Sequence, residues 1–174
     1  PYTGNSTGFV QWRGGGRDYL HAGAEALADL PAKPALPYLA NIGCLDHIAT
    51  RVTAAHRDKA MLEFMRLTGY NFELALFIEE MNSITNVTRL SETDFALVFT
   101  SGIKPFVSEA VSGPTEKFVH LYGARAHHMA FNTVHIEDTC AALGRDGLKY
   151  LIDLMGSERE GLKQTFTVPS KRTW

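Results

Sequence analysis

Two stretches of this chain share one plan, in which a histidine in an apolar, strand-like run is followed by an amphipathic helix. His47 belongs to the first stretch, and a helix is expected over about residues 57–67. His128 belongs to the second, and a helix is expected over about 136–146. This internal repeat constrains the fold, because both units must then be built in the same way. Histidines at equivalent places in two repeated units also predict two ligands that converge on one metal ion.

The strands expected around the two helices complete a repeated βαβββ unit. Period-two alternation of apolar side chains predicts three strands after the first helix, over 72–78, 83–90 and 95–100. Only two strands follow the second helix, over 148–154 and 162–168, so we expect its last strand to be missing from the sequence. The expected fold is therefore α+β, with paired βαβββ modules that form a half-open β-barrel.

The two modules account for about residues 41–102 and 125–174, and a loop followed by a short helix joins them. Residues 1–40 differ from the rest in composition, with a glycine triplet and three closely spaced prolines. We interpret residues 1–40 as the tail of a preceding domain plus a linker, and residues 41–174 as the double-module domain.

Composition argues against several functions. The formal net charge is −2 and the 17 Lys and Arg residues are scattered, so a nucleic-acid partner is not expected. No stretch is long and apolar enough to span a membrane, and no signal peptide is visible. Both cysteines, Cys44 and Cys140, lie in apolar runs and are expected to be reduced core residues. We therefore expect a cytoplasmic protein that contacts neither nucleic acid nor membrane.

A set of short motifs in a fixed order resembles one enzyme family. The motifs are Leu45-Asp46-His47, Ile84-Thr85-Asn86-Val87, a helical segment over 118–123, His128-Met129-Ala130-Phe131-Asn132-Thr133 and Ile136-Glu137-Asp138-Thr139. In this order they resemble the 4-hydroxyphenylpyruvate dioxygenases of the vicinal oxygen chelate superfamily. The similarity spans about residues 42–174 and corresponds to the catalytic C-terminal half of such an enzyme.

The resemblance implies a non-haem Fe(II) centre held by two histidines and one glutamate. It places the two histidine ligands at His47 and His128, and it places the glutamate on a strand beyond Trp174. Glu158 and Glu160 lie in a turn-like run and are not assigned as the third ligand. The implied reaction converts an aromatic 2-oxo acid and O2, as 4-hydroxyphenylpyruvate is converted to homogentisate in tyrosine catabolism. A homo-oligomer is also expected.

The sequence departs from the family in the segment that normally contacts the substrate. Ser108 stands where an Asn is usual, and Pro114-Thr115 stand where a Gln is common. Two alternatives therefore stay open. One is another metal enzyme of the same superfamily, such as an extradiol dioxygenase or a glyoxalase-like isomerase. The other is a non-catalytic small-molecule-binding module on the same fold.

The remaining expectations concern side-chain direction. An aromatic-lined cavity could use Phe95, Leu97 and Phe99, or their neighbours, depending on strand register. His127 precedes the second proposed ligand by one residue, so a regular strand would point it to the opposite face, although a supporting role is possible. His56 and His135 open or follow elements and are expected at solvent positions.

Overall fold

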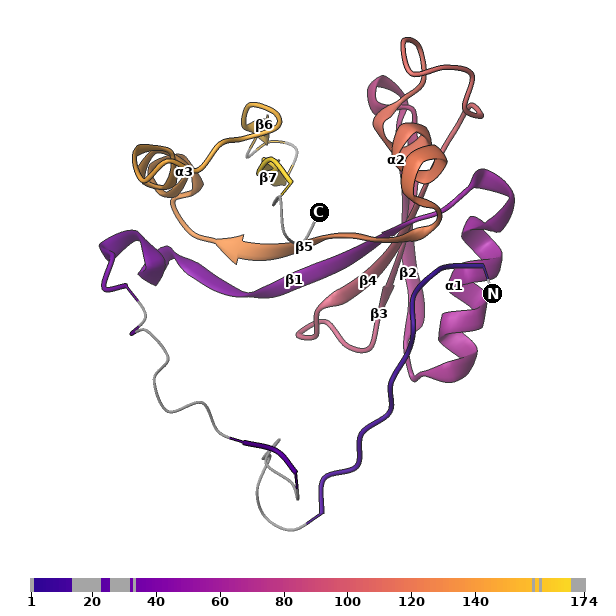
Figure 1. Cartoon of the computed structure of the whole chain (residues 1–174), viewed down its shortest axis with the longest axis horizontal. Helices are drawn as coiled ribbons and strands as arrows, with labels where there is room; N and C mark the ends of the chain where they lie inside the picture. The colour runs from indigo at the N-terminus through magenta and orange to yellow at the C-terminus, as the bar shows by residue number, and fades with distance from the viewer. Residues whose placement is uncertain are drawn as a thin grey trace.

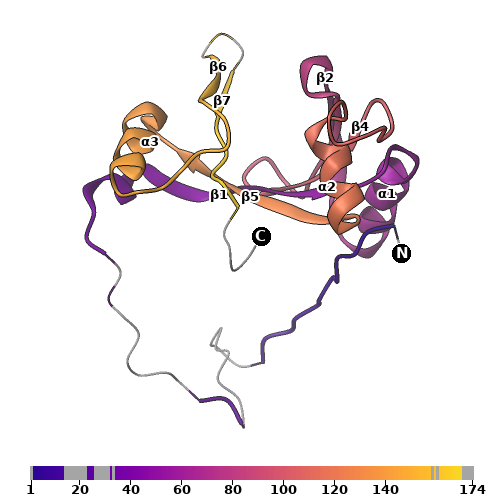
Figure 2. The same cartoon turned by 45° about the horizontal axis from the view of Figure 1, so that its top comes forward.

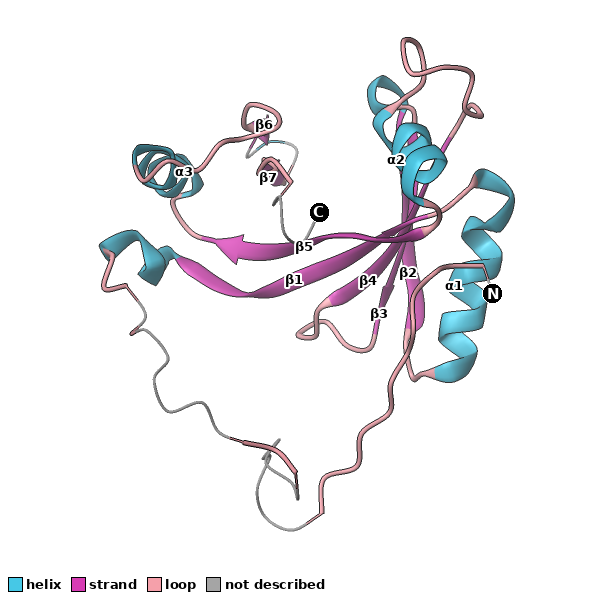
Figure 3. Cartoon of the chain, viewed as in Figure 1, coloured by secondary structure: helices cyan, strands magenta, loops and turns pink. Residues whose placement is uncertain are grey.

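The computed structural model describes residues 2–13, 23–25, 32, 34–157, 159 and 161–169. Its elements, in chain order, are η1 (Pro37–Asn41), β1 (Ile42–Arg51), η2 (Ala54–His56), α1 (Arg57–Leu67), β2 (Asn71–Ile78), η3 (Glu79–Met81), β3 (Ser83–Arg89), β4 (Ala96–Gly102), α2 (Pro114–Tyr122), β5 (Arg125–Thr133), α3 (Ile136–Arg145), β6 (Met155–Ser157) and β7 (Leu162–Gln164). Figure 3 shows the resulting mixture of helices and strands, which confirms the α+β class. No helix of the described residues is long and apolar enough to cross a membrane.

A five-stranded sheet in the order β2-β3-β4-β1-β5 organises the molecule (Figure 1). β1 runs parallel to β4 and antiparallel to β5, so it joins the two repeated units along one seam. The sheet is open and does not close into a barrel. Both main helices begin and end within one residue of their expected limits, at 57–67 and 136–145.

The first unit has a packed interior under α1. Ala60, Met61 and Phe64 recur at helical spacing and give α1 one apolar face. This face meets Val52 and Phe99 of the sheet, and the exposed fraction of Val52, Ala60, Met61 and Phe99 is at most 8%. Tight packing of this kind stabilises the unit through buried apolar surface.

Strand register decides which side chains face away from α1. Phe99 and Leu97 pack with the α1 cluster, so they are not available to line a cavity on the other face. Alternation along β4 turns Ala96 and Val98 to that other face, where they pack with Ala49 of β1. The neighbours of the expected aromatic residues therefore occupy the face that also carries His47.

The second unit is assembled more loosely. β5 pairs with β1, whereas β6 and β7 pair only with each other in a two-stranded sheet. The two strands expected over 148–154 and 162–168 do run antiparallel, because the N–H of Leu151 donates to the carbonyl of Phe166 at 2.7 Å. Most of 148–154 is nevertheless irregular, and the regular part of that arm is β6. The expected strand near residues 173–174 lies outside the described residues.

The β6–β7 hairpin and α2 rise from the same side of the long β1–β5 ribbon, as Figure 2 shows. α3 lies beside η1, where the side-chain amide of Asn41 donates to Thr139 Oγ1 at 3.0 Å. The N-terminal stretch also contacts this ribbon, because the side-chain amide of Asn5 donates to Thr50 Oγ1 at 2.7 Å. Its assignment as the tail of a preceding domain stays a prediction.

Two single-residue expectations need correction. Cys44 is exposed and is not a core residue, because the buried apolar part of β1 begins only at Ala49; Cys140 is half-buried. His56 is half-buried and its ring lies 5.4 Å from that of Tyr2, whereas His135 is exposed as expected. His135 adopts the left-handed conformation, with φ of 49°, immediately before α3.

Candidate metal centre

The seam between β1 and β5 brings His47 and His128 together. His47 lies opposite Ala130, and His128 lies opposite Ala49, so the two histidines are diagonal neighbours on one face. Their Nε2 atoms are 3.2 Å apart, and their rings meet edge to face with centroids 5.3 Å apart. One residue of each repeated unit thus contributes to a single cluster.

Two β-bulges shape this cluster. The β1–β5 register shifts between Leu45 and His47, where Asp46 is the extra residue, and again between Ala49 and Thr50, where β5 has the extra residue His127. A bulge places two successive side chains near one face, which a regular strand forbids. The expectation that His127 points to the opposite face is therefore wrong, and the bulge is the physical reason.

Each proposed ligand is held at its Nδ1 atom by the residue before it. The Nδ1 atom of His47 lies 2.7 Å from Oδ2 of Asp46, and the Nδ1 atom of His128 lies 2.7 Å from Nδ1 of His127. A hydrogen bond at one ring nitrogen fixes the orientation of the imidazole and directs the other nitrogen. Both rings consequently direct Nε2 toward the same point.

Burial and nearby positive charge keep His127 and His128 uncharged. Burial, followed by the charges of His127, His47 and Arg51, lowers the pKa of His128 to about 3. Burial, followed by the charge of Arg51, lowers the pKa of His127 to about 4. Both imidazoles are therefore neutral at neutral pH, and a neutral imidazole is the form that binds a metal ion.

Aromatic side chains border the histidines on both sides. Phe118 of α2 meets the His127 ring edge to face at 4.7 Å, and Phe166 of the hairpin meets the His128 ring in the same way at 4.9 Å. The guanidinium of Arg51 lies 5.5 Å from the centre of the Phe118 ring. Spacing along the sequence could not identify Phe166 or Arg51, because their contacts depend on how the hairpin and α2 pack.

His47 and His128 have the spacing of two ligands on one divalent metal ion, but the described residues supply no third ligand. Two nitrogens that each lie about 2.1 Å from one ion are separated by about 3.0–3.4 Å when the ligand angle is between about 90° and 109°. The observed separation of 3.2 Å lies in that range. Within the described ranges no group of three or more His, Cys, Asp or Glu side chains is arranged so that it could hold a metal ion. Glu158 and Glu160 lie outside the described residues.

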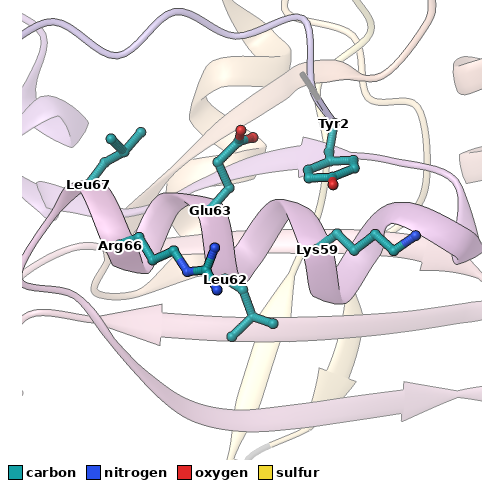
Figure 4. A pocket seen from close by; sticks show the side chains of 6 residues that line it. All are labelled: Tyr2, Lys59, Leu62, Glu63, Arg66 and Leu67. Atoms are coloured by element: carbon teal, nitrogen blue, oxygen red, sulfur yellow. The ribbon is translucent and has the colours of Figure 1, made fainter.

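Two pockets of the described surface lie away from this cluster. One is a hollow over the outer face of α1, lined by Tyr2, Lys59, Leu62, Glu63, Arg66 and Leu67 (Figure 4). A second lies between η1 and α3. Neither includes His47 or His128, and neither contains a cluster of metal-binding side chains. The convergence of the histidines, and not a cavity, therefore identifies the candidate site.

Known structures share this fold. One crystal structure of a methylmalonyl-CoA epimerase is 20% identical over 74% of this chain and 87% of its own, with a TM-score of 0.59. The methylmalonyl-CoA epimerase from Mycobacterium tuberculosis is 12% identical over 74% and 89%, with a TM-score of 0.56. Hypothetical protein BH1468 from Bacillus halodurans C-125 is 17% identical over 71% and 92%, with a TM-score of 0.55.

Comparison at the sequence level finds nothing further: no protein-family model matches the chain, and no curated protein matches it. The structural similarity is too low in identity to transfer an activity, so it establishes architecture alone. The chain has the vicinal oxygen chelate fold.

Proposed function

We propose that this chain belongs to a metal-dependent enzyme, an Fe(II) dioxygenase that acts on an aromatic 2-oxo acid in the manner of 4-hydroxyphenylpyruvate dioxygenase. His47 and His128 are its proposed histidine ligands. The observation that supports this proposal most directly is the 3.2 Å separation of their Nε2 atoms, one from each repeated unit. The proposed third ligand is a glutamate on a strand beyond Trp174.

The residues of the chain have distinct proposed roles. Asp46 accepts a hydrogen bond from Nδ1 of His47, and this leaves the lone pair on Nε2 of His47 available to bind a metal ion. Phe118 and Phe166 border the histidine cluster and would limit access of water to a bound aromatic acid. Bound Fe(II) would supply O2 activation coupled to decarboxylation of the 2-oxo acid.

A second candidate is proton-transfer chemistry on the same fold. The solved structures with the same architecture include methylmalonyl-CoA epimerases, one of them determined in complex with methylmalonyl-CoA. A metal ion held by the same histidines could serve an isomerase of this or the glyoxalase-like kind, and extradiol cleavage of a catechol is a related alternative. A non-catalytic binding module is the remaining alternative.

Oxygen consumption separates these alternatives. The protein, extended to include the proposed glutamate, would be loaded with Fe(II) without oxygen and assayed in an oxygen electrode with 4-hydroxyphenylpyruvate and with catechol. We expect uptake with the 2-oxo acid, and we expect His47→Ala and His128→Ala to reduce it to background. His56→Ala is the matched control, because His56 lies outside the cluster, and it should retain activity.

Other outcomes would redirect the proposal. Uptake with catechol alone would indicate an extradiol dioxygenase. Exchange of a substrate proton in heavy water without oxygen uptake would indicate an isomerase or epimerase. Normal uptake in His47→Ala would contradict the assignment of that ligand. The proposed homo-oligomer and the cytoplasmic location need separate tests, by light scattering and by localisation of the tagged protein.

A further inference from the structure

We propose that Asn5 is a positioning residue for the histidine cluster: its side-chain amide bridges β1 and β5 beside the bulge and so holds His128 within reach of His47. This inference rests on the proposed metal site, and it assigns a role to a residue outside the motifs that resemble the dioxygenases. The contacts that carry it span 45 and 121 positions of the chain, so no local sequence pattern reveals them.

The register of β5 depends on a single irregular ladder. Among the described strands, β5 pairs with β1 alone. The β1–β5 ladder contains three register shifts, and the one between Ala49 and Thr50 makes His127 the extra residue. A slip by one residue would turn the side chains of β5 to the other face and would take His128 away from His47. The position of His128 therefore depends on what fixes the ladder beside the bulge.

The side-chain amide of Asn5 joins the two strands at the first residue pair beyond the bulge. Thr50 of β1 and Ala126 of β5 lie opposite each other there. Nδ2 of Asn5 donates to Thr50 Oγ1 at 2.7 Å, and the backbone N–H of Ala126 donates to Oδ1 of Asn5 at 2.8 Å. An amide carries a donor group and an acceptor side by side, so a single side chain spans both strands. Because an N–H group needs an acceptor, the Ala126 contact also fixes which way the amide points.

The two ends of this bridge lie in different surroundings. The exposed fraction of Thr50 is 0%, so water does not replace the Asn5 bond at its hydroxyl. At the other end, Ala126 directly precedes His127, so the bond to its N–H fixes the start of the bulged segment. The amide of Asn5 thus ties the bulge to a buried position of the first unit.

Two contacts on the N-terminal side of Asn5 hold its segment in place. The N–H of Gly4 donates to the carbonyl of Ala124 at 2.6 Å, and a Cβ atom at Gly4 would lie 2.9 Å from that oxygen. Tyr2 packs against the apolar cluster under α1, and Figure 4 shows its ring over the helix. The ring centroids of Tyr2 and His56 are 5.4 Å apart. Asn5 is therefore carried by a segment that is fixed both to α1 and to the start of β5.

Three substitutions separate positioning from simple stabilisation. Asn5→Leu keeps the size of the side chain without its polar atoms. Asn5→Asp keeps an acceptor for the N–H of Ala126, and the Thr50 hydroxyl can turn to donate to it, so this variant should preserve the bridge. Tyr2→Ala is the matched control, because it removes packing from the same segment and leaves the amide intact. Circular dichroism establishes that each variant is folded before it is compared.

The first readout needs no metal. In nuclear Overhauser spectra of the metal-free protein, ring protons of His47 and His128 should give a cross-peak, since their ring centroids are 5.3 Å apart. We expect this cross-peak to be kept in Asn5→Asp and Tyr2→Ala and lost in Asn5→Leu. Wild-type intensity in Asn5→Leu would overturn the inference and leave the proposed metal site intact. Equal loss in Tyr2→Ala would also overturn it, because the segment as a whole, and not the amide, would then be responsible.

The second readout is affinity for Zn(II), titrated into the extended protein that is used for the oxygen assay. We expect Asn5→Leu to bind Zn(II) about tenfold more weakly than wild type, and the other two variants to stay within about threefold. Affinities that fall together with the free energy of unfolding in all three variants would overturn the inference, because they would show a structural role alone. The predicted pattern of cross-peaks in an extended protein that binds no Zn(II) would instead overturn the proposed function and leave the positioning role standing.

Discussion

The two repeated units use the same plan with different results. In the first unit, β1 to β4 form a continuous sheet with α1 packed on it, and the buried apolar side chains of the described chain all lie between residues 49 and 99. In the second unit, β5 joins that sheet while β6 and β7 pair only with each other. Large apolar side chains such as Met129 and Phe131 are 63% and 51% exposed there.

The stability of the fold and the geometry of the proposed metal site therefore depend on different parts of the molecule. The first unit supplies most of the interior that stabilises the described fold. The proposed metal ligands lie at the seam, one on β1 and one on β5, where bulges reorient side chains. Stability and ligand geometry should consequently respond to different substitutions.

The largest stability effect is expected for Phe99→Ala. Phe99 is 3% exposed and packs against α1, so its removal should lower the free energy of unfolding by about 3–5 kcal/mol. Urea unfolding followed by circular dichroism measures this change. A loss below about 1 kcal/mol would show that the first unit is not the main source of stability.

A smaller effect is expected where the first unit meets the connector helix. A Cβ atom at Gly102 would overlap Oε1 of the buried Glu116, so Gly102→Ala should cost about 1–3 kcal/mol. Glu116→Ala removes the closest obstacle and leaves only the Lys104 carbonyl oxygen, at 2.9 Å, although it also removes a hydrogen bond from Asn82 at 2.8 Å. The double variant should therefore be more stable than the sum of the two single changes predicts. Strict additivity in unfolding experiments would contradict this contact.

Tyr150→Phe tests how the hairpin arm packs on α3. The Tyr150 hydroxyl donates to the carbonyl of Cys140 at 3.0 Å, and its loss should cost about 0.5–1.5 kcal/mol. Burial, together with this hydrogen bond, raises the pKa of Tyr150 to about 12. Its contribution is therefore complete below the unfolded pKa of about 10 and is lost as pH rises toward 12. Alkaline unfolding of wild type and variant, compared at pH 8 and 11, measures both effects.

The smallest effect is expected for Phe131→Ala in the second unit. Half of the Phe131 side chain is exposed already, so the free energy of unfolding should change by less than about 1 kcal/mol. This variant is the matched control for Phe99→Ala, because both remove a phenyl ring from a strand of the same sheet. A loss as large as that of Phe99→Ala would mean that the second unit is covered in solution, for instance by a second copy.

Local patterns predicted the elements better than their packing. The helical spacing of Ala60, Met61 and Phe64 specified α1, because helix periodicity is a local property. The pairing of β6 with β7 alone could not be predicted, since strand partners are chosen through long-range contacts. The exposure of Cys44 was missed for the same reason.

The candidate site was also predicted only in part from the sequence. The repeat predicted that His47 and His128 would meet, because equivalent strands of two modules lie side by side. The place of His127 could not be predicted, since a single extra residue in a ladder leaves no local sequence signal and reverses the side-chain direction. Asp46 was visible in its motif, but its contact with His47 also depends on a bulge.

The most direct test of the metal site is the number of histidines bound to one ion. X-ray absorption at the iron edge, on protein loaded anaerobically with one equivalent of Fe(II), counts imidazole ligands at about 2.1 Å. The proposed site predicts two imidazoles in wild type and one in each of His47→Ala and His128→Ala. An unchanged count of imidazoles in either variant, or none in wild type, would contradict the claim that these two histidines hold the metal.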